Sequence, residues 1–357
     1  MPITPTEFTL ELTPRARVDV IDVRRIIAAR LGEDALDVYP RALCCSFHTT
    51  AGYLDRGVAA RLGRNEADVM PYIDVFRTMF PERAGYEHDK LDRRTELTEE
   101  QKPREPLNAD SHLAFMAGAL RTCVSYPNRR NDPIAFVDLD GIHDGHVRQR
   151  VTTVLGYTAE ETVAQSRVVV PVSSHSVDSI NLKDPSLGVY ETCRDLVVRH
   201  GVTKGRVRLA LAPGEHHAGL TVNEYETLLM RHDLQDVLRD PLRFMAEKAG
   251  HMLGNPRAIP AKTLDYAKYD LVRVFNKLVD SLGLRESMVE SVLSKAIGMP
   301  AARFLRMKRS VSLLVSDRNE PGQGAIVEGT YQSPILVQWH RGARQARVLD
   351  VTLTRFI

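Results

Sequence analysis

The chain has 357 residues, of which 43% are hydrophobic, and its 48 Lys and Arg against 46 Asp and Glu give a formal net charge of +2. The length predicts about two domains, and ordinary apolar content with small net charge excludes a disordered chain. Near-neutrality also gives no electrostatic reason to expect nucleic acid or an anionic membrane as a partner.

No stretch of the sequence is apolar for the roughly 18 residues that a membrane span needs. The N-terminal segment MPITPTEFTLEL has no basic-then-apolar leader. The four cysteines fit neither a disulfide framework nor a CxxC metal motif. We therefore expect a cytoplasmic protein that contacts no membrane.

The first half of the chain predicts a defined series of elements. Residues 18–31 have apolar side chains at helical spacing, and residues 39–55 form a β-rich run that ends in a polar, glycine-containing segment. The charged, proline-punctuated residues 81–107 are typical of a surface loop. A helix-like apolar segment from 112 and a strand within 145–157 complete this half.

The second half repeats this order. Residues 188–200 have helical spacing, residues 203–224 again run from β-rich to polar, and residues 342–356 resemble 145–157. The alignment places Glu215, His216 and His217 opposite the string His-Thr-Thr that begins at 48. We predict a tandem duplication with domains at 1–160 and 161–357 and a boundary within the polar stretch 158–166.

The second predicted domain carries a long insert at residues 225–309. Its apolar residues recur at i, i+3 or i+4, and i+7, which predicts helices. The apolar faces of these helices would lie in a core or at a subunit interface.

Three histidines of the first half lie in different predicted elements. His48 follows a strand, His88 lies in the polar insert, and His112 opens the helix-like segment. Neutral imidazoles on separate elements are what a three-histidine metal site needs, and Asp89 or Asp110 could orient the rings. Spacing alone does not show that they converge, and a surface or core role is the commoner one for any single histidine.

Two arginine pairs have two interpretations each. Arg148 and Arg150 share one face of a strand, where their guanidinium groups could hold a phosphate or carboxylate or form cross-strand salt bridges. Arg344 and Arg347 are three positions apart, so they face opposite sides of a regular strand and need a bulge to act together.

Cys44 and Cys45 are neighbours on the strand that precedes His48. By two-residue alternation Cys44 shares a face with His48, and Cys45 points the other way. Buried packing is the default interpretation of both, with a thiol role as the alternative.

Four strings, FHTTAGYLD, YEHD, NADSHL and GTYQSPILVQWHRGARQARV, occur in the order of motifs in the YjbQ family, also called the secondary thiamine-phosphate synthase family. The chain resembles this family over most of 8–157 and at the two ends of the second half. The resemblance implies an α+β fold of two tandem YjbQ-like β-sandwich domains with flanking helices. It also implies a homo-oligomer, since the family forms trimers.

Carried over by residue, the resemblance assigns His48, Thr49 and Thr50 to the family's HTT segment. It assigns His88 and Asp89 to the histidine and aspartate of its YxHD element. The family's clustered histidines imply a metal site at these positions.

Asn108, Asp110 and His112 match the Asn and the two His of the family's NAHAH segment, so an aspartate stands where the family has its first histidine. An oxygen ligand from Asp110 would then join the imidazoles.

The GTYQ string ending at Gln332 matches the family's GTWQ strand, and Arg344 and Arg347 match its paired arginines loosely. Glu215 replaces the leading histidine of HTT in the second half. The first half in turn lacks GTWQ, so the motifs are divided between the two halves.

We therefore expect a metal-dependent enzyme that acts on a small anionic metabolite, such as a phosphorylated one. His48, His88 and His112 would bind zinc or iron, which would act as a Lewis acid or activate water or oxygen. The expected catalytic residues are Asp89, Asp110, Glu215 and Thr49. The expected substrate contacts are Thr50, Asn108, Arg148, Arg150, Gln332, Arg344 and Arg347.

The family label suggests thiamine-phosphate synthase-like activity. A metal-dependent oxygenase or lyase is one alternative. A non-catalytic metal- or ligand-binding scaffold, whose helical insert binds a partner, is another.

Overall fold

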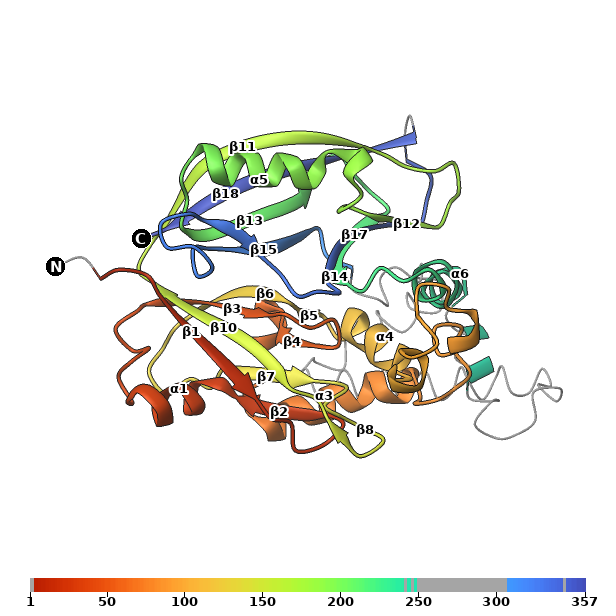
Figure 1. Ribbon diagram of the computed structural model, residues 1–357, viewed down its shortest axis with the longest axis horizontal. Helices are drawn as coiled ribbons and strands as arrows, with labels where there is room; N and C mark the ends of the chain where they lie inside the picture. Colours follow the sequence, from red (N-terminus) through yellow and green to blue (C-terminus); the bar gives the residue numbers. More distant parts are fainter. Residues whose placement is uncertain (1–2, 241–242, 245–246, 249–306, 343–344) are drawn as a thin grey trace, which may run out of the picture. The chain divides into compact units, whose positions relative to one another are not determined.

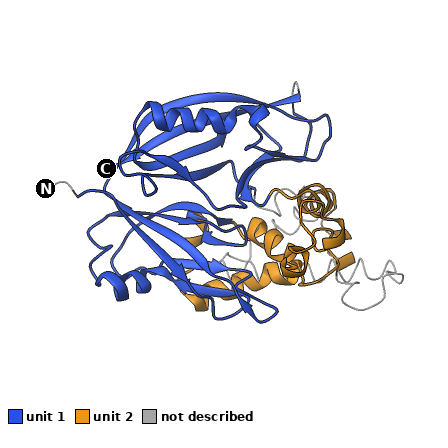
Figure 2. Cartoon of the chain, viewed as in Figure 1, with its two compact units in different colours: residues 1–56, 120–224, 307–357 blue, residues 57–119, 225–306 orange. Residues whose placement is uncertain are grey.

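The computed structural model describes residues 3–240, 243–244, 247–248, 307–342 and 345–357 of a mixed α/β chain with several antiparallel sheets (Figure 1). Its residues group into two compact units (Figure 2). We call residues 1–56, 120–224 and 307–357 the β unit. Residues 57–119 and 225–306 form the insert unit. Within the described residues, no helix is both long and apolar enough to cross a membrane.

The first half of the chain gives the β unit two antiparallel sheets. One has the order β1 (Thr6–Leu12), β10 (Arg150–Tyr157), β3 (Arg41–Ser46), β6 (Cys123–Pro127). The other has the order β2 (Asp19–Asp22), β7 (Ala135–Asp138), β4 (Ala51–Leu54), β5 (Leu120–Arg121). A short hairpin, β8 (Ile142–His143) with β9 (His146–Val147), precedes β10.

The helix expected at 18–31 is shorter than its apolar spacing indicated. α1 spans Val23–Leu31, and the residues before it form β2. Asp22 sets the start of the helix, because its carboxylate accepts a hydrogen bond from the backbone N–H of Arg24.

The second half supplies two further sheets. The larger has the order β11 (Glu160–Pro171), β18 (Ala346–Phe356), β13 (Lys204–Leu211), β15 (Ser310–Ser316), β16 (Ala325–Val327). The smaller has the order β12 (Asp178–Asn181), β17 (Ser333–Gln338), β14 (Ala218–Asn223). A 3-10 turn η3 (Pro185–Leu187) leads into α5 (Val189–Arg199), as the helical spacing of 188–200 predicted.

Seven strands of each half follow the same order, and among the described strands β5 and β16 have no counterpart. β1-β10-β3-β6 corresponds in sequence position and pairing to β11-β18-β13-β15, and β2-β7-β4 corresponds to β12-β17-β14. α1 follows the second strand of its half, and so does α5.

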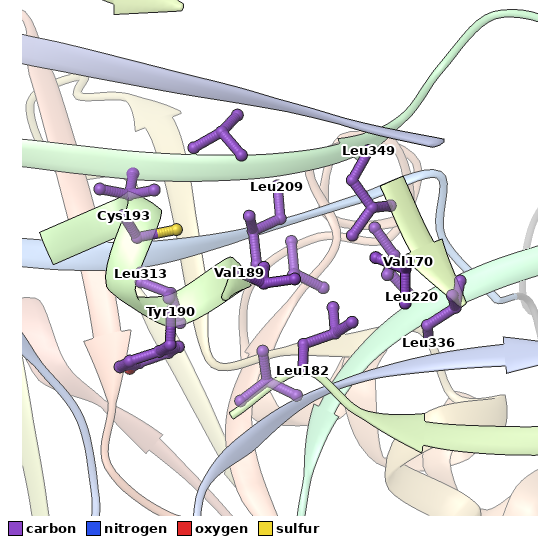
Figure 3. Packing of buried hydrophobic residues seen from close by; sticks show 14 of the residues in the cluster. Val170, Leu182, Val189, Tyr190, Cys193, Leu209, Leu220, Leu313, Leu336 and Leu349 are labelled. Carbon is purple, nitrogen blue, oxygen red and sulfur yellow. The ribbon is translucent and has the colours of Figure 1, made fainter. Parts of the chain in front are cut away.

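A large apolar core lies between α5 and the sheets of the second half (Figure 3). The helix contributes Val189, Cys193 and Leu196, which recur at three- and four-residue spacing on one face. β13 contributes every second residue, including Val207 and Leu209, as a strand with one buried face does.

The insert unit contains short helices from both halves of the chain. The first half supplies α2 (Arg56–Ala59), which begins at the unit boundary, α3 (Glu66–Met79) and α4 (Ala109–Ala117). The second half supplies a π-helical turn η4 (Leu229–Asp233) that continues into α6 (Leu234–Arg239). The rest of the predicted insert helices, from 249 to 306, lies outside the described residues.

The segment 81–107 is irregular, as its composition predicted, but several of its side chains are buried and do not lie on the surface. It has only the 3-10 turns η1 (Leu91–Arg93) and η2 (Lys102–Arg104), yet it buries Tyr86, His88 and Arg94 completely or nearly so. The Tyr86 hydroxyl donates to the carbonyl of Pro81, and Arg94 pairs with Glu96 and Glu105, so these buried polar groups have partners.

Candidate functional site

The insert unit buries a group of ionisable side chains around His88. His88, His112, Glu226 and Asp233 are 0%, 1%, 4% and 1% exposed. Charged side chains are seldom buried unless they are paired, and such groups gather at functional sites. We call this group, with Asp89, Asn108 and Asp110, the His88 cluster.

Asp233, the last residue of η4, fixes the backbone at His88. Its Oδ1 accepts a hydrogen bond from the backbone N–H of Glu87 at 3.0 Å, and its Oδ2 accepts one from the backbone N–H of His88 at 2.9 Å. These two hydrogen bonds fix the backbone of residues 87–88, which belong to neither a helix nor a strand.

Both ring nitrogens of His88 have polar partners. Nδ1 lies 3.0 Å from Oε2 of Glu226, and Nε2 lies 3.2 Å from Oδ1 of Asn108. Because an ionised carboxylate only accepts hydrogen bonds, Nδ1 carries a proton and donates it to Glu226. Nε2 hydrogen-bonds to the Asn108 oxygen only when the ring carries a second proton.

Glu226 is itself held as a carboxylate. Its two oxygens accept hydrogen bonds from the backbone N–H groups of Leu228 and Leu229, each at 2.7 Å. Burial raises the pKa of Glu226, but the hydrogen bonds from His88 and from these two N–H groups outweigh it, so the pKa lies below its ordinary value.

Asp89 connects the cluster to the start of α4. Its Oδ1 accepts a hydrogen bond from the backbone N–H of Ala109 at 3.1 Å. Its Oδ2 is buried and has no hydrogen-bond partner among the described residues. Burial raises the pKa of Asp89 to about 6 against the pull of His88 and the Ala109 N–H, and the nearby Asp110 and Asp233 raise it further.

His112 lies on the first turns of α4, beside His88. The two ring centroids are 5.2 Å apart, and the planes meet edge to face at 77°. Asp110 precedes it on the same helix and is 8% exposed. The cluster thus combines two adjacent imidazoles with a carboxyl group that titrates near neutral pH.

His48 belongs to the β unit and has a different environment. It lies in the loop after β3, which ends at Ser46, so strand alternation does not extend from Cys44 to His48. Its Nε2 accepts a hydrogen bond from the backbone N–H of Val151 at 2.7 Å. Burial, with the charges of Arg150 and Arg148, lowers the pKa of His48 to about 3.

Gln332 supports the same loop from the second half of the chain. Its side-chain amide donates hydrogen bonds to the backbone carbonyls of Ser46 and His48, each at 2.9 Å. A side chain on Gly329 would meet the carbonyl oxygen of Phe47 at 1.9 Å, so the GTYQ turn requires glycine there. These contacts give Gln332 a role in loop geometry.

The arginines expected to bind substrate take part in ion pairs. Arg150, 2% exposed, makes a bidentate pair with Asp138 at 2.7 and 2.8 Å and also lies 3.4 Å from the hydroxyl of Thr50. Arg148 pairs with Asp140. The expectation that both arginines share one face of a strand is wrong, because β10 begins at Arg150 and Arg148 precedes it. Each arginine forms its own ion pair with an aspartate.

Glu215 and Arg347 form an ion pair in the second half of the chain. Nη1 of Arg347 lies 3.0 Å from Oε2 of Glu215, and Oε1 of Glu215 accepts a hydrogen bond from the backbone N–H of Val348 at 2.8 Å. Arg344 lies outside the described residues.

The expected site residues fall into two groups. The insert unit brings together His88, Asp89, Asn108, Asp110 and His112. The β unit contains His48, Thr49, Thr50, Arg148, Arg150, Glu215, Gln332 and Arg347. Across the described parts of the chain, no three His, Cys, Asp or Glu side chains form a group that could hold a metal ion.

Glu226 and Asp233 were not identified from the sequence. Glu226 lies 138 positions from His88, at the start of an insert for which no motif was recognised. The only signal was that two acidic residues seven positions apart open a helical insert, which is a common surface pattern.

Neither a protein-family model nor a curated protein matches the chain. Among solved structures, it is similar to a YbjQ-like protein of unknown function from Sulfolobus solfataricus P2, with 15% identity and a TM-score of 0.30 over 55% of this chain and 99% of that one. A hypothetical protein from Aeropyrum pernix K1 has 13% identity and a TM-score of 0.27 over 54% and 98%. An uncharacterized conserved protein of the YjbQ family from Clostridium acetobutylicum has 14% identity and a TM-score of 0.25 over 55% and 100%.

Proposed function

We propose that this protein is an enzyme and that the His88 cluster is its acid–base centre. The observation that carries the proposal is the buried arrangement of Asp89, with one unpartnered oxygen, in a group with His88 and His112. A carboxyl group whose pKa lies near neutrality can take up a proton in one step and return it in another. Glu226 and Asn108 would keep the His88 ring in one orientation meanwhile.

The charge of the cluster favours a neutral or cationic reacting group over the anionic one expected from the arginines. Its carboxyl groups outnumber the two imidazoles. Arg150 and Arg347 are committed to Asp138 and Glu215. We propose a small-molecule substrate from which, or to which, a proton is transferred, as in a lyase.

The three-histidine metal site fits the observed contacts poorly. A metal ligand must offer a lone pair, but Nε2 of His48 accepts the N–H of Val151, and a neutral imidazole then keeps its proton on Nδ1. Nδ1 of His88 donates to Glu226, and Nε2 faces Oδ1 of Asn108 at 3.2 Å. Binding of zinc or iron stays a prediction of the family resemblance, to be checked by metal analysis of the purified protein, and no step proposed here passes through a metal.

We also propose that the two halves arose from tandem duplication of a YjbQ-like domain. The matching order of seven strands in each half supports this, as does a shared polar contact. His48 accepts the backbone N–H of Val151 at 2.7 Å, and Glu215, its aligned position, accepts that of Val348 at 2.8 Å. Assembly as a homo-oligomer stays a prediction of the same resemblance.

The acid–base proposal is tested with Asp89→Asn and a matched control, Asp92→Asn, which removes the same charge from an exposed position nearby. Turnover is followed by mass spectrometry, with the substrates of thiamine-phosphate synthase and with a mixture of small metabolites. We expect Asp89→Asn to lower turnover by about 100-fold or more, because a positioned proton carrier contributes that much, and Asp92→Asn to leave it unchanged.

Equal turnover in wild type and Asp89→Asn would overturn the proposal. Ligand binding without turnover of any compound would favour the non-catalytic scaffold instead.

A further inference from the structure

Two thiols of the β unit face each other across a strand pair. Cys45 on β3 lies directly opposite Cys123 on β6 in the antiparallel register, and their Sγ atoms are 3.3 Å apart. Both are free thiols in an apolar cluster that also contains Leu43 and Leu155.

The position within the ladder suits a bond between them. The next pair along the strands, Ser46 and Thr122, is hydrogen-bonded, with 2.7 Å between Ser46 N and Thr122 O. Hydrogen-bonded and non-hydrogen-bonded pairs alternate, so Cys45 and Cys123 occupy a non-hydrogen-bonded pair, in which the side chains approach most closely. The Cβ separation of such a pair, about 4.5–5.5 Å, needs only a small shift to reach the roughly 3.5–4.5 Å of a disulfide.

The other two cysteines lack this arrangement. Cys44 lies opposite Val124, and alternation turns it to the other face of the sheet from Cys45. Cys193 belongs to the separate core beneath α5. The register therefore selects one pair out of the four cysteines.

We propose that Cys45 and Cys123 are a site of reversible oxidation, at which a peroxide converts two thiols into one cross-strand disulfide. Cys123 is 9% exposed and Cys45 is 2% exposed, so the peroxide reaches Cys123 first. One peroxide oxygen passes to its sulfur to give a sulfenic acid, while the other leaves as water. Cys45 then attacks that sulfur, the S–S bond forms, and the sulfenic oxygen leaves as a second water.

The environment of Cys45 suits the second step. Burial raises the pKa of its thiol well above the ordinary value, and the neighbouring Cys123 sulfur raises it further. A thiol of this kind is a poor first target for an oxidant. It lies within 3.3 Å of the sulfur that it must attack, which compensates for its low thiolate fraction.

The disulfide would join residues 78 positions apart. The enclosed segment includes all of residues 57–119, the part of the insert unit that carries His88 and His112. Because a cross-link restricts the unfolded chain, oxidation should raise the unfolding temperature.

The test compares wild type, Cys45→Ala, Cys123→Ser and the control Cys44→Ser after treatment with hydrogen peroxide. Cys44 and Cys45 share every tryptic peptide, since no Lys or Arg separates them. The Cys44→Ser variant therefore shows whether the link to Cys123 comes from Cys45 or from Cys44. We expect non-reducing peptide mapping to show the 45–123 link in wild type and Cys44→Ser and in neither other variant. The unfolding temperature should rise with the link and fall back after dithiothreitol.

Two results would overturn the proposal. One is recovery of Cys45 and Cys123 as free thiols under peroxide conditions that oxidise added glutathione. The other is conversion of Cys123 to sulfinic acid, or a link through Cys44, in the wild-type protein. If both cysteine variants fail to fold, the mapping of wild type against Cys44→Ser still decides between these results.

Discussion

At the scale of single residues, His88 and His48 have different hydrogen-bond partners, and these partners suit the two imidazoles to different roles. His88 donates from Nδ1 to a buried carboxylate and keeps Nε2 toward Asn108. His48 accepts a backbone N–H and has a pKa of about 3, so it stays neutral at physiological pH. We therefore assign His88 to the proposed proton transfer. His48 instead stabilises the loop after β3 through its hydrogen bond to Val151.

Asp89 gives a prediction for stability against pH. Its pKa of about 6 lies above the ordinary 3.8, so the native state binds the proton more tightly than the unfolded chain does. The free energy of unfolding should fall as pH rises from about 4 to 6, with a total cost of about 2–3 kcal/mol. Asp89→Asn removes this cost while keeping an oxygen for the Ala109 N–H.

Urea unfolding at pH 4.5 and 7.5 measures this effect. The free energy of unfolding of Asp89→Asn should exceed that of wild type by about 1–3 kcal/mol at pH 7.5 and by little at pH 4.5. Asp92→Asn, at an exposed position, should behave as wild type at both pH values. An equal difference between wild type and Asp89→Asn at the two pH values would contradict the raised pKa.

At the scale of elements, the turn η4 determines where the irregular segment around His88 lies. Asp233 satisfies two successive backbone N–H groups of that segment. Asp233→Ala should therefore lower the free energy of unfolding by about 2–4 kcal/mol, because buried donors lose their acceptors. Asp236→Ala, on an exposed position of α6, is the matched control and should change it by less than about 0.5 kcal/mol. Similar losses in the two variants would argue against this anchoring role.

The carboxylate that pairs with the buried arginine stands at a different position in each half, which predicts that it can be moved from one position to the other. Asp138 and Gln338 lie opposite Ala51 and Ala218 at the same register position, and the buried arginine pairs with Asp138 in one half and with Glu215 in the other. Glu215→His alone leaves Arg347 without a carboxylate and should cost about 3–5 kcal/mol.

The double variant Glu215→His with Gln338→Asp copies the first half and should recover at least half of that loss. Urea unfolding of the four proteins in a double-mutant cycle measures the recovery. Additive losses would show that the two positions are not equivalent.

At the scale of the whole molecule, the sequence predicted several helices and strands, but it did not reveal Glu226 and Asp233 as partners of His88. Periodicity located α5, and the strand-rich segments appear as sheets in both halves, because a strand or helix with one buried face repeats that face in its sequence. β2 lies within the range 18–31 for which helical spacing predicts a helix, because four residues are too few to show a strand period. The motif resemblance grouped His48 with His88 and His112, and the last two belong to the insert unit with Asp89.

Long-range side-chain contacts explain what the sequence did not reveal. His48 belongs to the β unit, and His88 and His112 belong to the insert unit, although one family motif set includes all three. Glu226 reaches His88 across 138 positions of sequence. No local pattern encodes a partner at that distance when it comes from an insert outside the recognised motifs.

The central claim is that Asp89 is a proton carrier in a buried site, and its carboxyl pKa tests this most directly. In protein labelled with carbon-13 at aspartate Cγ, the resonance that disappears in Asp89→Asn belongs to Asp89. A pH titration of that resonance should give a midpoint of about 6. A midpoint at the ordinary value of 3.8 would show that Asp89 is ionised throughout the working pH range and would contradict the account.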